Sequence, residues 1–154
     1  MVERLMSRCL ILLVDDFEDG LAMYQEYLTY RGYQVLVARN GEEAIVQARL
    51  HRPDIILLDI RMAVMTGTDA MRILRSDPSF QRIPIIALTA HALESERRAA
   101  LAAGFDGWIP KPCLPDQLVL AVERIHAAGR ELPHVTAVHG RHATLGDGST
   151  LERR

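Results

Sequence analysis

The chain has 154 residues, of which 49% are hydrophobic, and its formal net charge is −2 at pH 7. This length fits one domain with a tail, and the near-balanced charge argues against a basic nucleic-acid-binding face. The apolar runs are too short and too often broken by charge to span a membrane, the first residues lack the cleavage site of a secretion signal, and two cysteines make no disulfide framework. We therefore expect a cytoplasmic protein.

Five short apolar runs alternate with longer segments of helical pattern. The runs are nearly continuous in apolar residues rather than alternating with polar ones, which is typical of strands buried on both faces of a parallel sheet. They cover residues 9–14, 34–38, 54–58, 84–89 and 107–109.

The segments between these runs have apolar residues at helical spacing and suitable end signals. Asn40 is a candidate N-cap, with Glu43 at the third helical position, and Pro115 suits the first turn of the last helix. The expected helices cover 18–31, with Leu21, Tyr24 and Leu28 inward; 41–50; 67–76, with Ala70, Ile73 and Leu74 inward; 94–103; and 115–128, with Leu118, Val122 and Ile125 inward. The alternation predicts an α/β fold with a doubly wound parallel sheet of five strands.

The pattern stops at residue 129. Residues 129–154 are rich in Gly, His and Thr and have no sustained period. We predict a domain over 8–128 and a C-terminal tail over 129–154 that is mostly disordered and too short to be a second domain.

Polar side chains follow four of the predicted strands at the point where each strand ends. Asp15 and Asp16 follow the first strand, Asp59 the third, Thr89 the fourth and Lys111 the fifth. Open α/β sheets bind ligands at the carboxyl ends of their strands, where the strand order reverses. If the order is 2-1-3-4-5, the first and third strands are neighbours, and the three carboxylates share one small volume.

Three close carboxylates repel one another unless a cation joins them or their pKa values rise. Mg²⁺ suits one or two carboxylates together with a phosphate. Lys111 is the only lysine, since the other 17 basic residues are arginine. A compact ammonium fits a cramped pocket that holds a metal better than a planar guanidinium does. Each residue also has a simpler reading, because an Asp after a strand often caps a helix, and Thr89 and Lys111 suit ordinary strand ends.

Four segments together match a known pattern over residues 8–128, in the expected order: "LLVDD", "DIILLDIRMAVMTG", "PIIALTAHAL" and "GFDGWIPKP". They resemble the receiver domain of two-component response regulators, the CheY-like family. The resemblance implies a flavodoxin-like (βα)5 fold with strand order 2-1-3-4-5. It also implies a phosphorylation-activated signalling switch that receives its phosphoryl group from a histidine kinase or histidine phosphotransfer protein.

The resemblance also assigns roles to residues of this sequence. It implies a downstream protein target and no enzymatic activity beyond the domain's own phosphotransfer and autodephosphorylation. From the charge, and with no DNA-binding output expected after residue 128, we expect no direct binding to nucleic acid. By position, the resemblance makes Asp59 the phosphoacceptor. It assigns direct binding of Mg²⁺ to Asp16, Asp59 and the backbone carbonyl of Arg61, and the water shell of the metal to Asp15. The phosphoryl oxygens are assigned to Thr89 and Lys111, and the switch to Thr89 and Trp108.

Several positions depart from the commonest family pattern. Ala63 stands where a proline is frequent, and Trp108 is larger than the usual Tyr or Phe. Arg61 and His91 lie at positions that tend to tune the phosphoryl lifetime, although both also read as solvated loop residues. Cys113 lies near the site, but a buried, inert thiol is the expected case.

Two other classes compete with a receiver domain. A phosphatase of the haloacid dehalogenase type also uses a strand-end aspartate and Mg²⁺, but it needs a second Asp where this chain has Arg61. A pseudo-receiver would fold without switching, which the complete set of polar residues argues against. With no output domain expected after residue 128, we expect a stand-alone receiver rather than one taken from a hybrid kinase.

Overall fold

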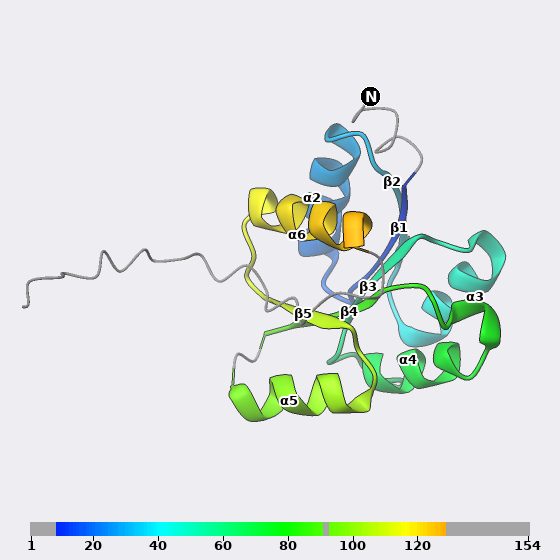
Figure 1. Cartoon of the computed structure of the whole chain (residues 1–154). Coiled ribbons are helices and arrows are strands. Elements are labelled where there is room, and N and C mark those ends of the chain that lie inside the picture. The colour runs from blue at the N-terminus through cyan, green and yellow to red at the C-terminus, as the bar shows by residue number, and fades with distance from the viewer. Residues whose placement is uncertain (1–8, 91–92, 129–154) are drawn as a thin grey trace, which may run out of the picture.

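A computed structural model describes residues 9–90 and 93–128. Its five strands form one parallel sheet in the order β2-β1-β3-β4-β5, which confirms the predicted fold class and strand order (Figure 1). The strands are β1 (Leu10–Val14), β2 (Gln34–Ala38), β3 (Ile55–Asp59), β4 (Ile85–Thr89) and β5 (Gly107–Pro110).

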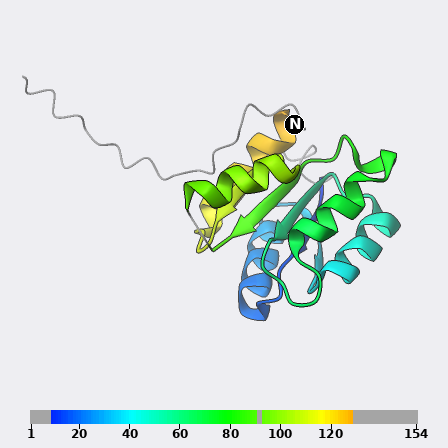
Figure 2. The same cartoon turned by 90° about the horizontal axis from the view of Figure 1, so that it is seen from below.

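Helices cover both faces of this sheet. In Figures 1 and 2, α2 and α6 lie on one face, and α3, α4 and α5 lie on the other. A short 3-10 turn, η1, follows α4. The bounds are α2 (Glu18–Tyr30), α3 (Gly41–His51), α4 (Gly67–Arg75), η1 (Pro78–Phe80), α5 (Glu94–Ala103) and α6 (Pro115–Ala128). None of the helices in the described part of the chain is long and apolar enough to cross a membrane.

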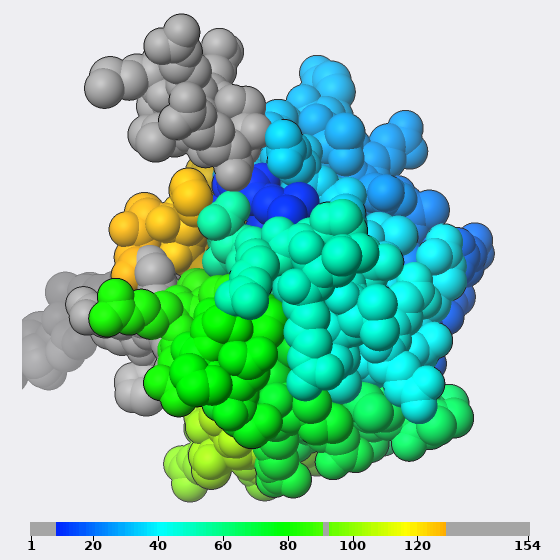
Figure 3. All heavy atoms as spheres, turned by 90° about the vertical axis from the view of Figure 1, so that its right-hand side faces the viewer, coloured from blue at the N-terminus to red at the C-terminus, as the bar shows by residue number. Residues whose placement is uncertain are grey.

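The sheet separates two hydrophobic cores. Along β1, Ile11 and Leu13 pack toward α2 and α6, whereas Leu12 and Val14 pack toward α3 and α4. Because successive side chains of a strand point to opposite faces, a strand covered on both sides needs apolar residues at every position. This explains the nearly continuous apolar runs. Figure 3 shows the side of the molecule on which α3 and α4 lie against each other.

The predicted helix faces are correct with one exception. The inward residues expected in α2 and α6 are buried, but Ile73 of α4 is 36% exposed, and Met71 is buried in its place. The inner stripe of α4 runs through Ala70, Met71 and Leu74, so Ile73 falls at its margin. The Met71 sulfur lies beside Gly104, where α5 ends.

The end signals of α3 also appear as expected. The Asn40 side chain accepts a hydrogen bond from the Glu43 N–H at 2.8 Å. The Glu43 carboxylate accepts from the N–H of Arg39 at 3.2 Å, one residue before the cap. The remaining strand and helix ends agree with the prediction to within one residue. Residues 129–154, predicted to be a tail, lie outside the described residues, and the domain limits of 8–128 stay a prediction.

Candidate functional site at the carboxyl ends of the strands

Three carboxylates meet at the carboxyl ends of β1 and β3. These strands are parallel neighbours in which Val14 pairs with Leu58, so the residues that follow, Asp15 and Asp59, lie side by side. One oxygen from each of Asp15, Asp16 and Asp59 lies within 4.8 Å of the other two. Asp15 and Asp59 are buried, with 1% and 4% of their surface exposed, whereas Asp16 is exposed. The structure therefore brings together the three acids that the sequence placed at this edge.

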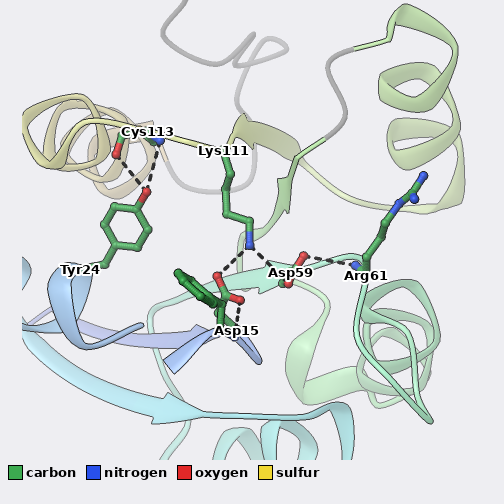
Figure 4. A network of polar contacts seen from close by, with 7 residues as sticks. Asp15, Tyr24, Asp59, Arg61, Lys111 and Cys113 are labelled. Atoms are coloured by element: carbon green, nitrogen blue, oxygen red, sulfur yellow. Dashed lines mark hydrogen bonds and ion pairs between the residues drawn. The ribbon is translucent and has the colours of Figure 1, made fainter. Parts of the chain in front are cut away.

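Lys111 reaches into this group from the end of β5 (Figure 4). Its Nζ lies 2.8 Å from Oδ2 of Asp15 and 3.4 Å from Oδ2 of Asp59. The other oxygens are also engaged, since Asp15 Oδ1 accepts from the N–H of Phe17 at 3.0 Å and Asp59 Oδ1 accepts from the N–H of Arg61 at 3.2 Å. One ammonium among three ionised carboxylates leaves an excess of two negative charges.

Burial and the neighbouring charges together change the acidity of these groups. Burial raises the pKa of Asp59 to about 6, and the charge of Asp15 adds to this effect, while Lys111 and the N–H of Arg61 oppose it. Burial alone would lower the pKa of Lys111, but its hydrogen bond to Asp15 and the charge of Asp59 outweigh burial and raise that pKa above its ordinary value. Lys111 is therefore an ammonium at neutral pH, and a further cation would be favoured beside the acids.

The loop after Asp59 folds back tightly on the end of β3. A Cβ atom at Gly67 would lie 2.0 Å from the backbone oxygen of Asp59, and the Gly67 N–H donates to the Ile60 carbonyl at 2.8 Å. Only glycine permits this approach. At the tip of the loop, Val64 is fully exposed with a φ of 69°. Sequence reading treated Gly67 only as the start of a helix and missed its role beside Asp59.

A family model for the response regulator receiver domain matches residues 11–123. The chain belongs to this family. As a receiver domain, it is a phosphorylation-dependent switch of two-component signalling. The match decides against the haloacid dehalogenase alternative.

Relatives and solved structures agree with this assignment. The polar-differentiation response regulator DivK of Brucella anthropi is 33% identical over 102 residues, which cover 66% of this chain and 83% of DivK. The chemotaxis response regulator CheY4 of Vibrio cholerae has a TM-score of 0.73 and 32% identity, covering 76% of this chain and 98% of that one. The receiver domain of the Pseudomonas aeruginosa sensor histidine kinase PA1611, with a magnesium ion in its active-site cleft, has a TM-score of 0.72 and 34% identity, covering 77% and 98%.

The remaining predicted residues of the receiver domain lie around the acids rather than among them. Thr89 ends β4, is 8% exposed, and lines an open hollow of about 270 Å³ between α4 and α5, together with Arg61 and Glu96. The backbone carbonyl of Thr89 accepts from the N–H of Lys111 at 2.7 Å, which joins the ends of β4 and β5.

Trp108 is buried in the core between the sheet and α5. It is 3% exposed, and the guanidinium of Arg97 lies 3.8 Å from its ring centroid. This distance is typical of a cation–π contact, in which the negative face of the ring attracts the cation. The contact ties the predicted switch aromatic to α5.

Arg61 makes a contact that the sequence did not predict. Its side chain is 64% exposed, yet its Nη2 donates to the Glu96 carboxylate of α5 at 3.1 Å. The loop after Asp59 is therefore connected to α5 through an ion pair. His91, the other residue expected to tune the phosphoryl lifetime, lies outside the described residues.

The two cysteines are free and buried, as expected for inert thiols. Burial raises the pKa of Cys9 to about 12 and also raises the pKa of Cys113. Neither thiol is therefore a thiolate at neutral pH.

Proposed function

We propose that this receiver domain accepts a phosphoryl group on Asp59 from a histidine kinase or a histidine phosphotransfer protein. The observation that carries the proposal is the position of Asp59, which is buried at the end of β3 with Lys111 Nζ 3.4 Å from its Oδ2 and Arg61 N–H on its Oδ1. A carboxylate nucleophile needs the charge of the incoming phosphoryl group to be neutralised, because catalysis of phosphoryl transfer is mostly positioning and electrostatics.

The acids also fit a bound Mg²⁺. Asp15 is held more closely than Asp59, since its contacts to Lys111 and the Phe17 N–H are 2.8 and 3.0 Å, against 3.4 Å to Lys111 and 3.2 Å to the Arg61 N–H for Asp59, which supports an indirect role for Asp15 through metal-bound water. Asp16 and Asp59, with the backbone carbonyl of Arg61, would be the direct ligands. Mg²⁺ bound there would neutralise charge on the phosphoryl oxygens. The magnesium ion in the cleft of the PA1611 receiver supports this assignment.

Different side chains of the protein have different roles in the transfer. A carboxylate oxygen of Asp59 bonds to phosphorus while the bond from phosphorus to the donor imidazole nitrogen breaks, and that electron pair stays on the nitrogen. The Lys111 ammonium and the Thr89 hydroxyl bind the phosphoryl oxygens, which also hold them in line with the donor. The product is an aspartyl phosphate in place of the Asp59 carboxylate.

The new group changes the charge and size of a side chain at the sheet edge. Thr89 moves toward the phosphoryl oxygens, and Trp108 adjusts in the core beside it, which shifts α5, β5 and α6 between two arrangements. The Arg97 contact to Trp108 and the Arg61 contact to Glu96 supply two attachments through which α5 would sense the change. A downstream protein, rather than nucleic acid, would read this surface. The domain would act in the cytoplasm and have no catalytic activity beyond its own phosphotransfer and autodephosphorylation.

Labelling with acetyl phosphate tests the assignment of Asp59. We expect wild-type protein with Mg²⁺ to gain one acid-labile phosphoryl group, and Asp59→Asn, which keeps the shape but removes the nucleophile, to gain none. Asp69→Asn is the matched control, since Asp69 lies in the first turn of α4 and is not one of the three clustered acids. Labelling of Asp59→Asn at the wild-type level would overturn the assignment.

A further inference from the structure

The hydroxyl of Tyr24 connects α2 to the loop that follows Lys111 (Figure 4). It donates to the Cys113 carbonyl at 2.9 Å and accepts from the Cys113 N–H at 3.2 Å, across 89 residues of sequence. Tyr24 is 5% exposed and Cys113 is 8% exposed, so both bonds are shielded from water. The sequence pattern assigned Tyr24 only to the apolar face of α2, which does not explain two polar bonds from its hydroxyl.

These bonds fix the backbone two residues beyond the ammonium-bearing residue. On its other side, the N–H of Lys111 donates to the Thr89 carbonyl at 2.7 Å. The segment from Lys111 to Cys113 is therefore held at one end by β4 and at the other by α2. In the part of the chain that the structure describes, no other side chain bonds to the backbone of Cys113.

The position of this segment decides where the ammonium lies. The side chain of Lys111 is long and flexible, and it must keep its Nζ near Asp15 and Asp59 together, at 2.8 Å and 3.4 Å. A displacement of its backbone by about 1 Å is enough to impair a transfer that depends on positioning. Without this support, the loop could shift so that the ammonium contacts only one of the two carboxylates.

The ring of Tyr24 is well placed to supply this support. It packs in the same core as Leu21 and Leu28 of α2 and Leu118 of α6. Helix α2 begins at Glu18, two residues after Asp16. Helix α2 therefore follows the acid pair and also holds the loop after Lys111, so it sets the distance between the acids and this loop.

We propose that Tyr24 is a positioning residue that holds the Lys111 ammonium in the phosphotransfer site through its two bonds to the backbone of Cys113. The proposal rests on the function proposed above. It assigns to Tyr24 no contact with the phosphoryl group or the metal.

Tyr24→Phe is the variant that tests this role, because it removes the hydroxyl and keeps the buried ring. Tyr27→Phe is a matched control. Tyr27 lies one turn further along α2 and its hydroxyl donates to Asp116 at the start of α6, so this variant removes a tyrosine bond between α2 and the C-terminal segment without touching Cys113.

Three measurements separate positioning from general loosening. The first is the rate of labelling by acetyl phosphate, which we expect to fall about three- to tenfold in Tyr24→Phe, in keeping with the net value of a hydrogen bond. The second is the Mg²⁺ dissociation constant by calorimetry, expected to stay within twofold of wild type. The third is the nitrogen NMR signal of the lysine ammonium. Since Lys111 is the only lysine, lysine-labelled protein has one such signal, and we expect it to move toward the free-lysine position in Tyr24→Phe. Tyr27→Phe should match wild type in all three.

The outcomes distinguish this proposal from the proposed function. If wild-type protein takes no label, the proposed function fails, and the lysine signal alone decides whether Tyr24 positions the ammonium. If wild-type protein is labelled, the positioning role is overturned when Tyr24→Phe keeps either the wild-type rate or the wild-type lysine signal. It is also overturned when the Mg²⁺ affinity falls as much as the rate, since that is the result of a loosened domain.

Discussion

Two clusters of charged side chains lie at opposite ends of the same sheet, and they are built differently. At the amino end of β4 and β5, Arg75 pairs with Asp106, with side-chain exposures of 12% and 10%. At the carboxyl end, Lys111 faces Asp15 and Asp59, with Asp16 beside them. The first cluster balances one positive charge against one negative charge. The second has two more negative charges than positive ones when all its acids are ionised.

The hydrogen bonds of the amino-end cluster connect it to several elements of the fold. Arg75 also donates to the carbonyls of Phe80 and Ile83 at 2.7 Å each, and Asp106 accepts from the Ile85 N–H at 2.9 Å. These bonds join α4, η1 and the starts of two strands, so the amino-end cluster holds the fold together. The carboxyl-end cluster keeps an excess of negative charge, which favours a further cation there. Functional sites commonly depart from the rules that stabilise the rest of a fold.

Removing the cation of the balanced cluster should have the largest effect on stability. In Arg75→Met, Asp106 stays buried without its arginine, which typically costs about 3–5 kcal/mol of unfolding free energy. Urea unfolding at pH 7 measures the loss. Arg39→Met is the control, because the Arg39–Glu18 pair is 49% and 62% exposed, and an ion pair screened by solvent contributes little to stability. Equal losses in the two variants would remove the distinction between a structural pair and a surface pair.

At the other end, Lys111→Arg should impair the reaction more than the fold. The guanidinium keeps the charge but cannot occupy the same point between two carboxylates, so we expect the labelling rate with acetyl phosphate to fall by about 10²-fold, in the range for a lost preorganised electrostatic contact. Arg98→Lys, the reverse exchange at an exposed position of α5, should label at the wild-type rate. A wild-type rate in Lys111→Arg would mean that any cation suffices there.

The pH dependence of stability should have a defined sign at Asp59. Its pKa of about 6 in the folded protein lies above the value of about 4 in the unfolded chain. The contribution of this group to stability is therefore fully present below pH 4 and is lost as the pH rises through 6. Asp59→Asn removes the ionisation, so without metal it should stabilise the protein by about 2 kcal/mol at pH 8 and by almost nothing at pH 4.

Thermal or urea unfolding in a chelator at the two pH values measures this effect. The matched substitution at the other end of the sheet, Asp106→Asn, should destabilise the protein at pH 8, because it removes the partner of Arg75. Destabilisation by Asp59→Asn at pH 8 would contradict the view that ionising the buried Asp59 carboxyl beside Asp15 costs stability.

Much of the fold and of the site could be predicted from local patterns. The apolar runs indicated a sheet covered on both faces, and the polar residues directly after them indicated its functional edge. Asp15 and Asp59 meet because strand ends of a parallel sheet share one edge, which follows once β1 and β3 are neighbours. The resemblance to a receiver domain supplied that order in advance, and the structure confirmed it.

Other contacts had no local signal. The Tyr24 hydroxyl meets Cys113, and Arg61 meets Glu96, across 89 and 35 residues. Gly67 is needed because the loop returns to within van der Waals distance of Asp59, which only the folded chain shows. Ile73 was assigned inward from its spacing alone, and the position of α4 over the sheet decided otherwise.

By itself, the sequence determined the class of fold, the edge that carries the chemistry and the residue types gathered there, because periodicity and strand-end position are properties of short segments. Only the tertiary structure decided which oxygen faces the Lys111 ammonium, which helix supports its loop and which charges are balanced. These depend on distances between segments far apart in the chain, and such distances are set by packing rather than by any local pattern.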